Sequence, residues 1–471
     1  MPPIIPISRH FDQLTLSKMI DADPVVQRYR ARFALFDWSA IDPPRKGGPG
    51  YPAHPKSAYL KAALVRISEY ILTTPRWRAY LLDHPLLVLE LGFRPHLDFS
   101  QPYGFDVNKT VPSVRHFNNI LRTLDPRLLA HLFEQSVQAL QQEIPGLGEV
   151  VAYDVKHIYA NVKENNFRAY VLERFNKEQQ PKNDPDCRLG VKKSTNQVQP
   201  DGTTKEKKEL VWGYGSGVAA ATDPVYGDVV LADDTLPFNE NDVTYFVPLY
   251  IQTVAMLSAF PTHITADAAF DAWYAYQTCA RRSGIAAIPL NQHAHPVYER
   301  DADGTPLCPI GLPMHPTYQF QHTNGYRSQR YRCPLLYPAP TGQSCDHEQF
   351  RKHKGCVKDI NLEAGGLMRV TLDRESPLYQ LIYNQRTSCE RINSQAKDLG
   401  DSPTQSAQHP LGAHAQHPDL PHDQHQSPPK GQGDQCFLAE LPAHPGKLSE
   451  RPANDDLAEP GQPSHTSLRA V

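Results

Sequence analysis

The apolar pattern of the chain changes at about Pro145–Gly146, and this change limits the chain to a mixed architecture. Before it, over residues 57–91 and again after Ser113, apolar residues recur at the spacing of amphipathic helices. After it, short runs rich in β-branched and aromatic residues predominate. The pattern therefore excludes a chain built only from helices or only from strands. A length of 471 residues allows two to four domains.

The second part of the chain predicts an α/β domain with a mixed sheet. Three strands come first, then a helix, and after that strands and helices alternate. The predicted strands cover residues 150–159, 211–221, 226–232, 263–266 and 285–290. The predicted helices cover about 241–260, 270–283 and 378–397.

The last part of the chain has a composition unlike the rest. Residues 401–471 hold 11 of the 44 Pro and 7 of the 21 His, with Phe437 as their one aromatic residue and no Ile. Such a segment cannot bury enough apolar surface to fold, which predicts a disordered tail. A frameshifted or decayed gene end is our preferred interpretation, and a functional disordered extension is the alternative. The predicted domains are thus an α-helical part at 1–145, an α/β part at 146–400 and this tail.

Charge and hydropathy restrict the function classes only weakly. The formal net charge is −3, and residues 1–400 carry 44 basic and 42 acidic side chains, which permits a nucleic-acid partner without demanding one. No stretch approaches the roughly 18 apolar residues of a membrane span, and the first residues lack a signal-peptide pattern. Eight Cys are too few for a disulfide framework in a chain of this length. We therefore expect a cytoplasmic protein with reduced thiols or a metal site.

Three carboxylates stand where they could meet in the folded chain. Asp154 lies inside the first predicted strand, Asp267 ends the strand at 263–266, and Glu390 lies in the final helix. A carboxylate in a buried strand is costly unless it is paired or bound to a cation. Oxygen ligands of this kind suit Mg²⁺ or Mn²⁺. Taken singly, each has a simpler interpretation, since an Asp at a strand end often caps a helix and a Glu on a helix is often solvated.

The residues around Glu390 carry a resemblance to a known family. Tyr383, Arg386, Glu390 and Lys397 follow the spacing Y-x2-R-x3-E-x6-K. With the two Asp residues in the expected order, this string resembles the bacterial insertion-sequence DDE transposases that have the Tyr-Arg-Glu-Lys signature. The family often has Gly two residues after the second Asp, where this chain has Ala269.

The resemblance covers most of residues 1–400 and implies a ribonuclease H-like catalytic domain preceded by a DNA-binding helical region. It implies that Asp154, Asp267 and Glu390 bind two Mg²⁺ or Mn²⁺ ions. It further implies that Tyr383, Arg386 and Lys397 contact double-stranded DNA, both transposon ends and target, and that the protein acts as a homo-oligomer on DNA. Strand cleavage and strand transfer at the ends of its own element would be its activity.

More than a hundred residues separate Asp267 from Glu390, which predicts an insertion at about 295–370. Basic residues there alternate with aromatics, so that Arg327, Arg330 and Arg332 are candidate DNA contacts, with a solvated surface as the alternative. The insertion could also bind Zn²⁺, although no pair of its Cys has the tight spacing of a zinc ribbon, and unpaired thiols are the alternative. The candidate ligands are Cys308, Cys333, Cys345 and Cys356, with His315, His347 and His353 nearby.

Two other functions remain open from the sequence. One is a catalytically dead, DNA-binding remnant of a transposase, since the resembled family continues the catalytic helix into an apolar segment where this chain has its Pro-rich tail. The other is a related metal-dependent nuclease that hydrolyses DNA without joining it. The complete Tyr-Arg-Glu-Lys string favours the transposase over the nuclease.

Overall fold

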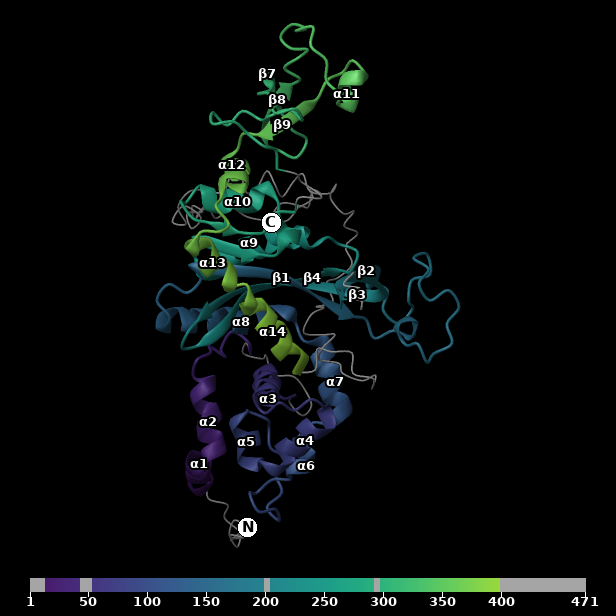
Figure 1. Cartoon of the computed structure of the whole chain (residues 1–471). Helices are drawn as coiled ribbons and strands as arrows, with labels where there is room; N and C mark the ends of the chain where they lie inside the picture. The colour runs from purple at the N-terminus through teal and green to yellow at the C-terminus, as the bar shows by residue number, and fades with distance from the viewer. Residues whose placement is uncertain (1–12, 43–52, 199–203, 292–296, 399–471) are drawn as a thin grey trace, which may run out of the picture.

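A computed structural model describes residues 13–42, 53–198, 204–291 and 297–398. Helices occupy one end of the molecule, a mixed sheet lies in the middle, and a small three-stranded sheet lies at the opposite end (Figure 1). The prediction of a mixed α/β protein is thereby confirmed. The predicted tail at 401–471 lies outside the described residues.

The N-terminal helices pack around one apolar cluster. Asp23 and Ser113 cap two of these helices, because their side chains accept backbone N–H bonds from Val25 and Val26 and from His116 respectively. Trp77 and Phe117 lie at the centre of the cluster, with ring centroids 4.3 Å apart. The helices are α1 (Gln13–Ala22), α2 (Pro24–Phe33), α3 (Lys56–Ser68), α4 (Thr74–Asp83), α5 (Pro85–Glu90), α6 (Val107–Thr110), α7 (Val114–Thr123) and α8 (Pro126–Glu143).

Helix α8 joins the helical part to the sheet. Near its start, Leu132 packs with Ile41 and Leu60 of the helical part. Near its end, Val137 and the following Ile144 belong to the core beneath the sheet. The predicted domain boundary at residue 145 therefore falls just after a helix that contributes to the cores on both sides.

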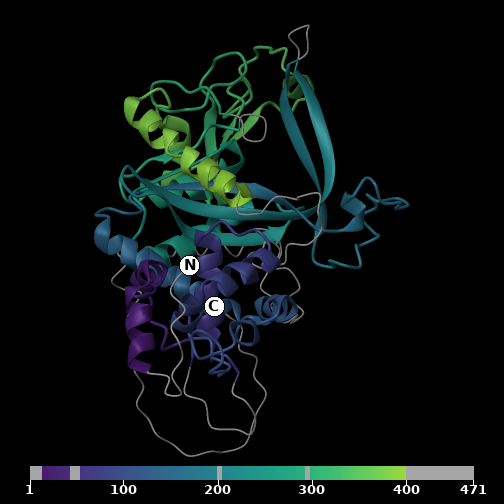
Figure 2. The ribbon, with the colours of Figure 1, turned by 90° about the horizontal axis from the view of Figure 1, so that it is seen from below.

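The central sheet is mixed. Strand β1 pairs antiparallel with β3 on one side and parallel with β5 on the other, and β6 extends the parallel edge. The 20-residue β3 also pairs antiparallel with β2 along its first half and with β4 along its second half. Figure 2 shows β2 and β3 leaving the body of the sheet as a long hairpin. The strands are β1 (Val150–Tyr159), β2 (Arg188–Val198), β3 (Thr204–Asp223), β4 (Gly227–Pro237), β5 (His263–Ala266) and β6 (Ala286–Ala287).

The two faces of the sheet have different partners. Along β1, Val151 and Tyr153 point into a large core shared with α9 (Phe246–Leu257) and α10 (Trp273–Ala280), whereas Ala152 points to the other face. That second face is covered by α14 (Thr387–Asp398), which crosses in front of β1 and β3 in Figure 1. Asp154 is two residues after Ala152 in the same strand, so its side chain points to the same face, the one under α14.

The sequence predicted β1 and β5 with their observed bounds, but three other predictions differ from the structure. The strand expected at 285–290 is only two residues long, and the single final helix is two helices, α13 (Pro377–Asn384) and α14. The helix breaks where Gln385 and Arg386 donate backbone N–H bonds three residues back, to Ile382 and Tyr383, instead of four. The helix predicted at 241–260 is shorter, and a 3₁₀ turn, η2 (Asp242–Tyr245), precedes α9.

The insertion forms its own three-stranded antiparallel sheet, in the order β7-β8-β9. Its chain leaves and returns at one buried carboxylate, Asp271. This carboxylate accepts a bond from the backbone N–H of Asn291 (2.7 Å), where the chain leaves, and two from Arg369 in the returning helix (2.7 and 2.6 Å). The elements are β7 (His315–Gln321), β8 (Arg327–Arg332), α11 (Glu348–Arg351), β9 (Val357–Asn361) and α12 (Ala364–Thr371).

Helix α12 lies so close to α10 that only glycine fits at position 365. A Cβ atom on Gly365 would lie 2.4 Å from the backbone oxygen of Trp273 and 2.4 Å from the backbone nitrogen of Gln277. We expect Gly365→Ala to destabilise the protein by about 1–3 kcal/mol, because the two helix backbones must separate. Gly304→Ala, at a position with open space around it but a φ of +80°, is the comparison for backbone strain alone. Urea unfolding of both variants measures the difference, and an equal loss would contradict the packing argument.

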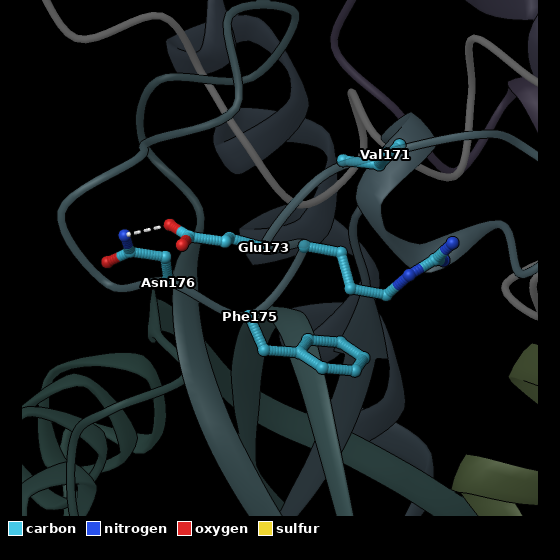
Figure 3. A pocket seen from close by; sticks show the side chains of 5 residues that line it. Val171, Glu173, Phe175 and Asn176 are labelled. Carbon is cyan, nitrogen blue, oxygen red and sulfur yellow. Dashed lines mark hydrogen bonds between the residues drawn. The ribbon is translucent and has the colours of Figure 1, made fainter.

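Within the described ranges, no helix is both long and apolar enough to cross a membrane. The loop between β1 and β2 carries a shallow hollow of about 580 Å³ lined by residues 171 and 173–176. Figure 3 shows Asn176 bonded to Glu173 at its rim, with Phe175 beside it. None of the predicted site residues lines this hollow.

Candidate active site

The sheet register places Asp154 and Asp267 next to each other. Tyr153 of β1 and Ala266 of β5 are partners in the parallel pairing, and each carboxylate belongs to the residue that follows. Asp154 lies in the middle of β1 and Asp267 directly follows β5, so both lie at the point where the parallel pairing of these two strands ends. Asp267 also begins the 3₁₀ turn η3 (Ala268–Phe270), and its Oδ1 accepts the backbone N–H of Ala269 at 2.9 Å.

Helix α14 brings Glu390 and Asn393 to the same region. The Asn393 side-chain amide donates to Oδ2 of Asp154 at 3.1 Å. Glu390 is half exposed, and its Oε1 pairs with Arg386 one helical turn earlier at 2.7 Å, as the predicted i,i+4 relation requires. The helix thus contacts Asp154 directly and holds a third carboxylate beside it.

Contacts away from these carboxylates hold α14 on the sheet. Arg391 makes two bonds of 2.7 and 2.6 Å to Asp228 of β4, whose side chain is almost fully buried. Cys389 is buried among Ala152, Val218 and other apolar residues of the sheet. The position of Glu390 along the sheet is therefore set by packing and by an ion pair that does not involve the candidate site.

Electrostatics indicate that the predicted carboxylates act on one another. Burial, the negative charge of Asp267 and, more weakly, that of Glu390 together raise the pKa of Asp154 to about 6, although Arg386 opposes them. Asp267 and Glu390 therefore both lie within electrostatic range of Asp154.

A fourth carboxylate, Asp242, was not predicted. Burial raises its pKa to about 6, and the charges of Asp267 and Asp154 contribute to the same shift. In the sequence it is an ordinary acidic residue at the start of a predicted helix, so no signal distinguished it. Asp242 is the first residue of η2, the turn that connects β4 to α9. This turn lies beside η3, which Asp267 begins.

In the described part of the chain, no three His, Cys, Asp or Glu side chains form a group that could hold a metal ion as they stand. The donor chemistry of Asp154 and Asp267 nevertheless fits Mg²⁺, which proteins commonly bind through one or two carboxylates together with substrate phosphates. The repulsion that raises the pKa of Asp154 is also the interaction that a bound cation would reverse. Two carboxylates plus a DNA phosphate therefore suit the ion better than a three-carboxylate cage.

The predicted DNA contacts lie in two places. On α13 and α14, the Arg386 guanidinium lies 5.8 Å from the ring centre of Tyr383, which stacks on Tyr379, and Lys397 is exposed. In the insertion, each of the three predicted arginines already has a protein partner. Arg327 pairs with Glu363, Arg330 makes two 2.8 Å bonds to Asp359, and Arg332 donates to the Tyr337 hydroxyl. Of the two groups, the one on α13 and α14 lies next to the candidate site, because Arg386 pairs with Glu390.

The four cysteines of the insertion, Cys308, Cys333, Cys345 and Cys356, gather in one cluster. All are free thiols, and burial together with the neighbouring Cys333 raises the pKa of Cys356 to about 12. His347 lies two residues beyond Cys345, in the segment that leads into α11. Thus the thiols that the sequence spaces widely are brought together by the fold.

Comparison of this chain with protein-family models, with curated proteins and with solved structures gives no significant match in any of the three.

Proposed function

We propose that this protein is a DNA transposase that cleaves and joins DNA at the ends of its own insertion sequence, using Mg²⁺ or Mn²⁺. The observation that carries the proposal is the adjacency of Asp154 and Asp267 where the parallel pairing of β1 and β5 ends, with Glu390 of α14 close to Asp154. The Tyr383, Arg386, Glu390 and Lys397 string runs along the same two helices.

A ribonuclease H-like fold is part of this proposal. The strand order supports it, because β4, β3 and β1 form an antiparallel run, and β5 and β6 continue it in parallel with β1. In this arrangement the first strand is central and carries the first carboxylate. The hairpin of β2 with β3 and the insertion after β6 are additions to that plan.

In the proposed reaction, water attacks a phosphodiester at the end of the element and breaks its P–O3′ bond, which leaves a 3′-hydroxyl and a 5′-phosphate. The 3′-hydroxyl then attacks a phosphodiester of the target DNA, forms a new P–O bond and displaces a target 3′-hydroxyl. A bound divalent cation supplies charge stabilisation at the phosphorus and a more acidic water. Asp154 and Asp267 would hold the cation. Arg386 would move between Glu390 and a DNA phosphate, since guanidinium groups bind both carboxylates and phosphates through paired hydrogen bonds.

The test uses a plasmid that carries the gene with its native flanking DNA. We expect Glu390→Gln to reduce Mg²⁺-dependent cleavage by about 10- to 100-fold, because the amide keeps the shape of the side chain but loses its charge near the cation. Binding of the same DNA, measured by fluorescence anisotropy, should change little. Glu178→Gln, which neutralises an exposed loop carboxylate, is the matched control and should leave cleavage unchanged.

The products separate the three functions. Cleavage at the element ends followed by joining to new DNA supports the transposase. Hydrolysis without joining would indicate the nuclease, and binding without cleavage by the unaltered protein would indicate the inactive remnant. Equal loss of binding and cleavage in Glu390→Gln would contradict the role assigned to this residue.

A further inference from the structure

The core of the insertion is unusual because thiols make up most of it. The buried members of its central cluster are Met314, Leu335 and three of the four cysteines, and Ile360 of β9 is buried outside that cluster. The small sheet β7-β8-β9 forms a cluster separate from the core of the main sheet. A module of this size with so few large apolar side chains rarely holds together by burial alone, and natural examples add disulfides or a structural metal.

The four cysteines come from four separate segments. Cys308 and Cys333 are each followed by Pro and begin tight turns, in which their carbonyl groups accept backbone N–H bonds from Gly311 (2.8 Å) and Leu336 (3.1 Å). Cys356 follows Gly355, whose φ is +66° and whose position leaves no room for a Cβ beside Cys333. The turns at these positions let the chain segments approach closely, so that Cys308, Cys333 and Cys356 lie in one cluster.

The segment at Cys345 adds two observations that point to a ligand. The backbone N–H of His347 donates to Sγ of Cys345 at 3.4 Å, which ties the two candidate ligands of this segment together. The ring nitrogen Nδ1 of His347 is buried and has no hydrogen-bond partner among the described residues. A buried imidazole nitrogen without a partner costs free energy. A metal ion could be bound by this nitrogen or by the neighbouring Cys345 sulfur.

From these observations we propose that the insertion binds one structural Zn²⁺ through Cys308, Cys333 and Cys356, with the fourth ligand from Cys345 or His347. The sulfurs are not arranged around a common point in the thiol form. Zinc binding would draw them together and release one proton for each thiol that becomes a ligand. Neither the catalytic carboxylates nor DNA takes part, so this site is independent of the proposed transposase activity.

The test measures zinc in the full-length protein, purified under reducing conditions with Zn²⁺ present and then dialysed. We expect one zinc per chain by mass spectrometry, and its complete release when a mercurial reagent modifies the thiols. In Cys308→Ser, Cys333→Ser and Cys356→Ser the zinc content should fall at least about tenfold, since each loses one of four ligands. Cys187→Ala, which changes a buried cysteine in another cluster, should retain the full zinc content.

Two further measurements complete the design. Cys345→Ser and His347→Gln identify the fourth ligand, because only the variant that removes it should lose zinc. Co²⁺ substituted for Zn²⁺ in the unaltered protein should show thiolate-to-metal charge-transfer absorption, which does not depend on any variant folding. Less than about 0.1 zinc per chain, zinc that survives the cysteine variants, or a Cys333–Cys356 disulfide in the reduced preparation would overturn the proposal. None of these readouts uses DNA cleavage, so failure here is distinct from failure of the proposed activity.

Discussion

Asp154→Asn should abolish metal-dependent DNA cleavage and, at about pH 7.5, make the protein more stable. Loss of a carboxylate that holds the cation removes several kcal/mol of transition-state stabilisation, which corresponds to a rate loss on the order of 10³-fold. Stability should change in the opposite direction, because the folded state now holds Asp154 as a buried anion beside Asp267. The amide removes that repulsion, and its oxygen can still accept the hydrogen bond from Asn393.

The pH dependence follows from the direction of the shift. The pKa of Asp154 is about 6 in the folded state and 3.8 ordinarily, so ionisation destabilises the folded protein at every pH above about 6. Two pKa units correspond to about 3 kcal/mol, which is the expected upper limit of the gain in unfolding free energy. The gain should shrink as the pH falls from 6 and disappear below about 4, where Asp154 is protonated in both states.

Denaturant unfolding from pH 4 to 8 and cleavage of the plasmid substrate measure the two effects. Added Mg²⁺ should stabilise the unaltered protein and not Asp154→Asn, since the ion binds only where the carboxylate remains. Asp303→Asn, at an exposed carboxylate of the insertion, is the matched control for both assays. An Asp154→Asn protein that cleaves normally, or that is less stable at pH 7.5, would contradict the site.

Arg369→Met should cost about 3–5 kcal/mol of unfolding free energy. The Asp271 side chain is fully buried, and besides both bonds from Arg369 it accepts the Tyr276 hydroxyl at 2.9 Å. Removing one partner of a buried ion pair leaves an uncompensated buried charge, which is far more costly than loss of an exposed pair. Asn291, where the chain enters the insertion, bonds to the same carboxylate and should lose its fixed position.

The control is Arg30→Met, which breaks partly exposed pairs with Glu90 and Asp21 and should cost less than about 1 kcal/mol. Adding Asp271→Asn to Arg369→Met should recover part of the loss, because the uncompensated charge is then gone. Denaturant unfolding of the unaltered protein, Arg369→Met, Asp271→Asn and the double variant gives the coupling energy, and Arg30→Met is measured beside them. Similar losses in Arg369→Met and Arg30→Met would show that Asp271 is not sealed from water.

The residues of the candidate site could be predicted because strand periodicity is a local property. Asp154 lies in β1 and Asp267 directly follows β5, two strands whose apolar patterns gave the observed bounds. The spacing of Arg386 and Glu390 predicted that these residues lie one turn apart, and the structure adds their ion pair. What the pattern could not show is the parallel register that places the two Asp residues side by side. Register depends on tertiary packing of both strands, and neither strand contains it alone.

The elements that the sequence did not predict have no apolar periodicity and no helix-breaking residue to mark them. Strand β2 and the first part of β3 are rich in Lys, Thr and Glu, so the hairpin shows no apolar alternation and is defined by its backbone pairing. The break between α13 and α14 has neither Pro nor Gly to mark it. Asp242 joins the acidic group only because it lies in a short 3₁₀ turn, η2, that packs beside η3.

The convergence of Asn291 and Arg369 on one carboxylate has a consequence for how this chain can be altered. Because the excursion between them begins and ends at a single anchored point, its length is not constrained by the sheet, and a short polar linker could replace it while preserving both bonds to Asp271. The same geometry lets gain, loss or exchange of this module proceed in evolution without disturbing the strands on which Asp154 and Asp267 stand. Asp271 thereby marks a graft point, where foreign sequence could be spliced into this scaffold.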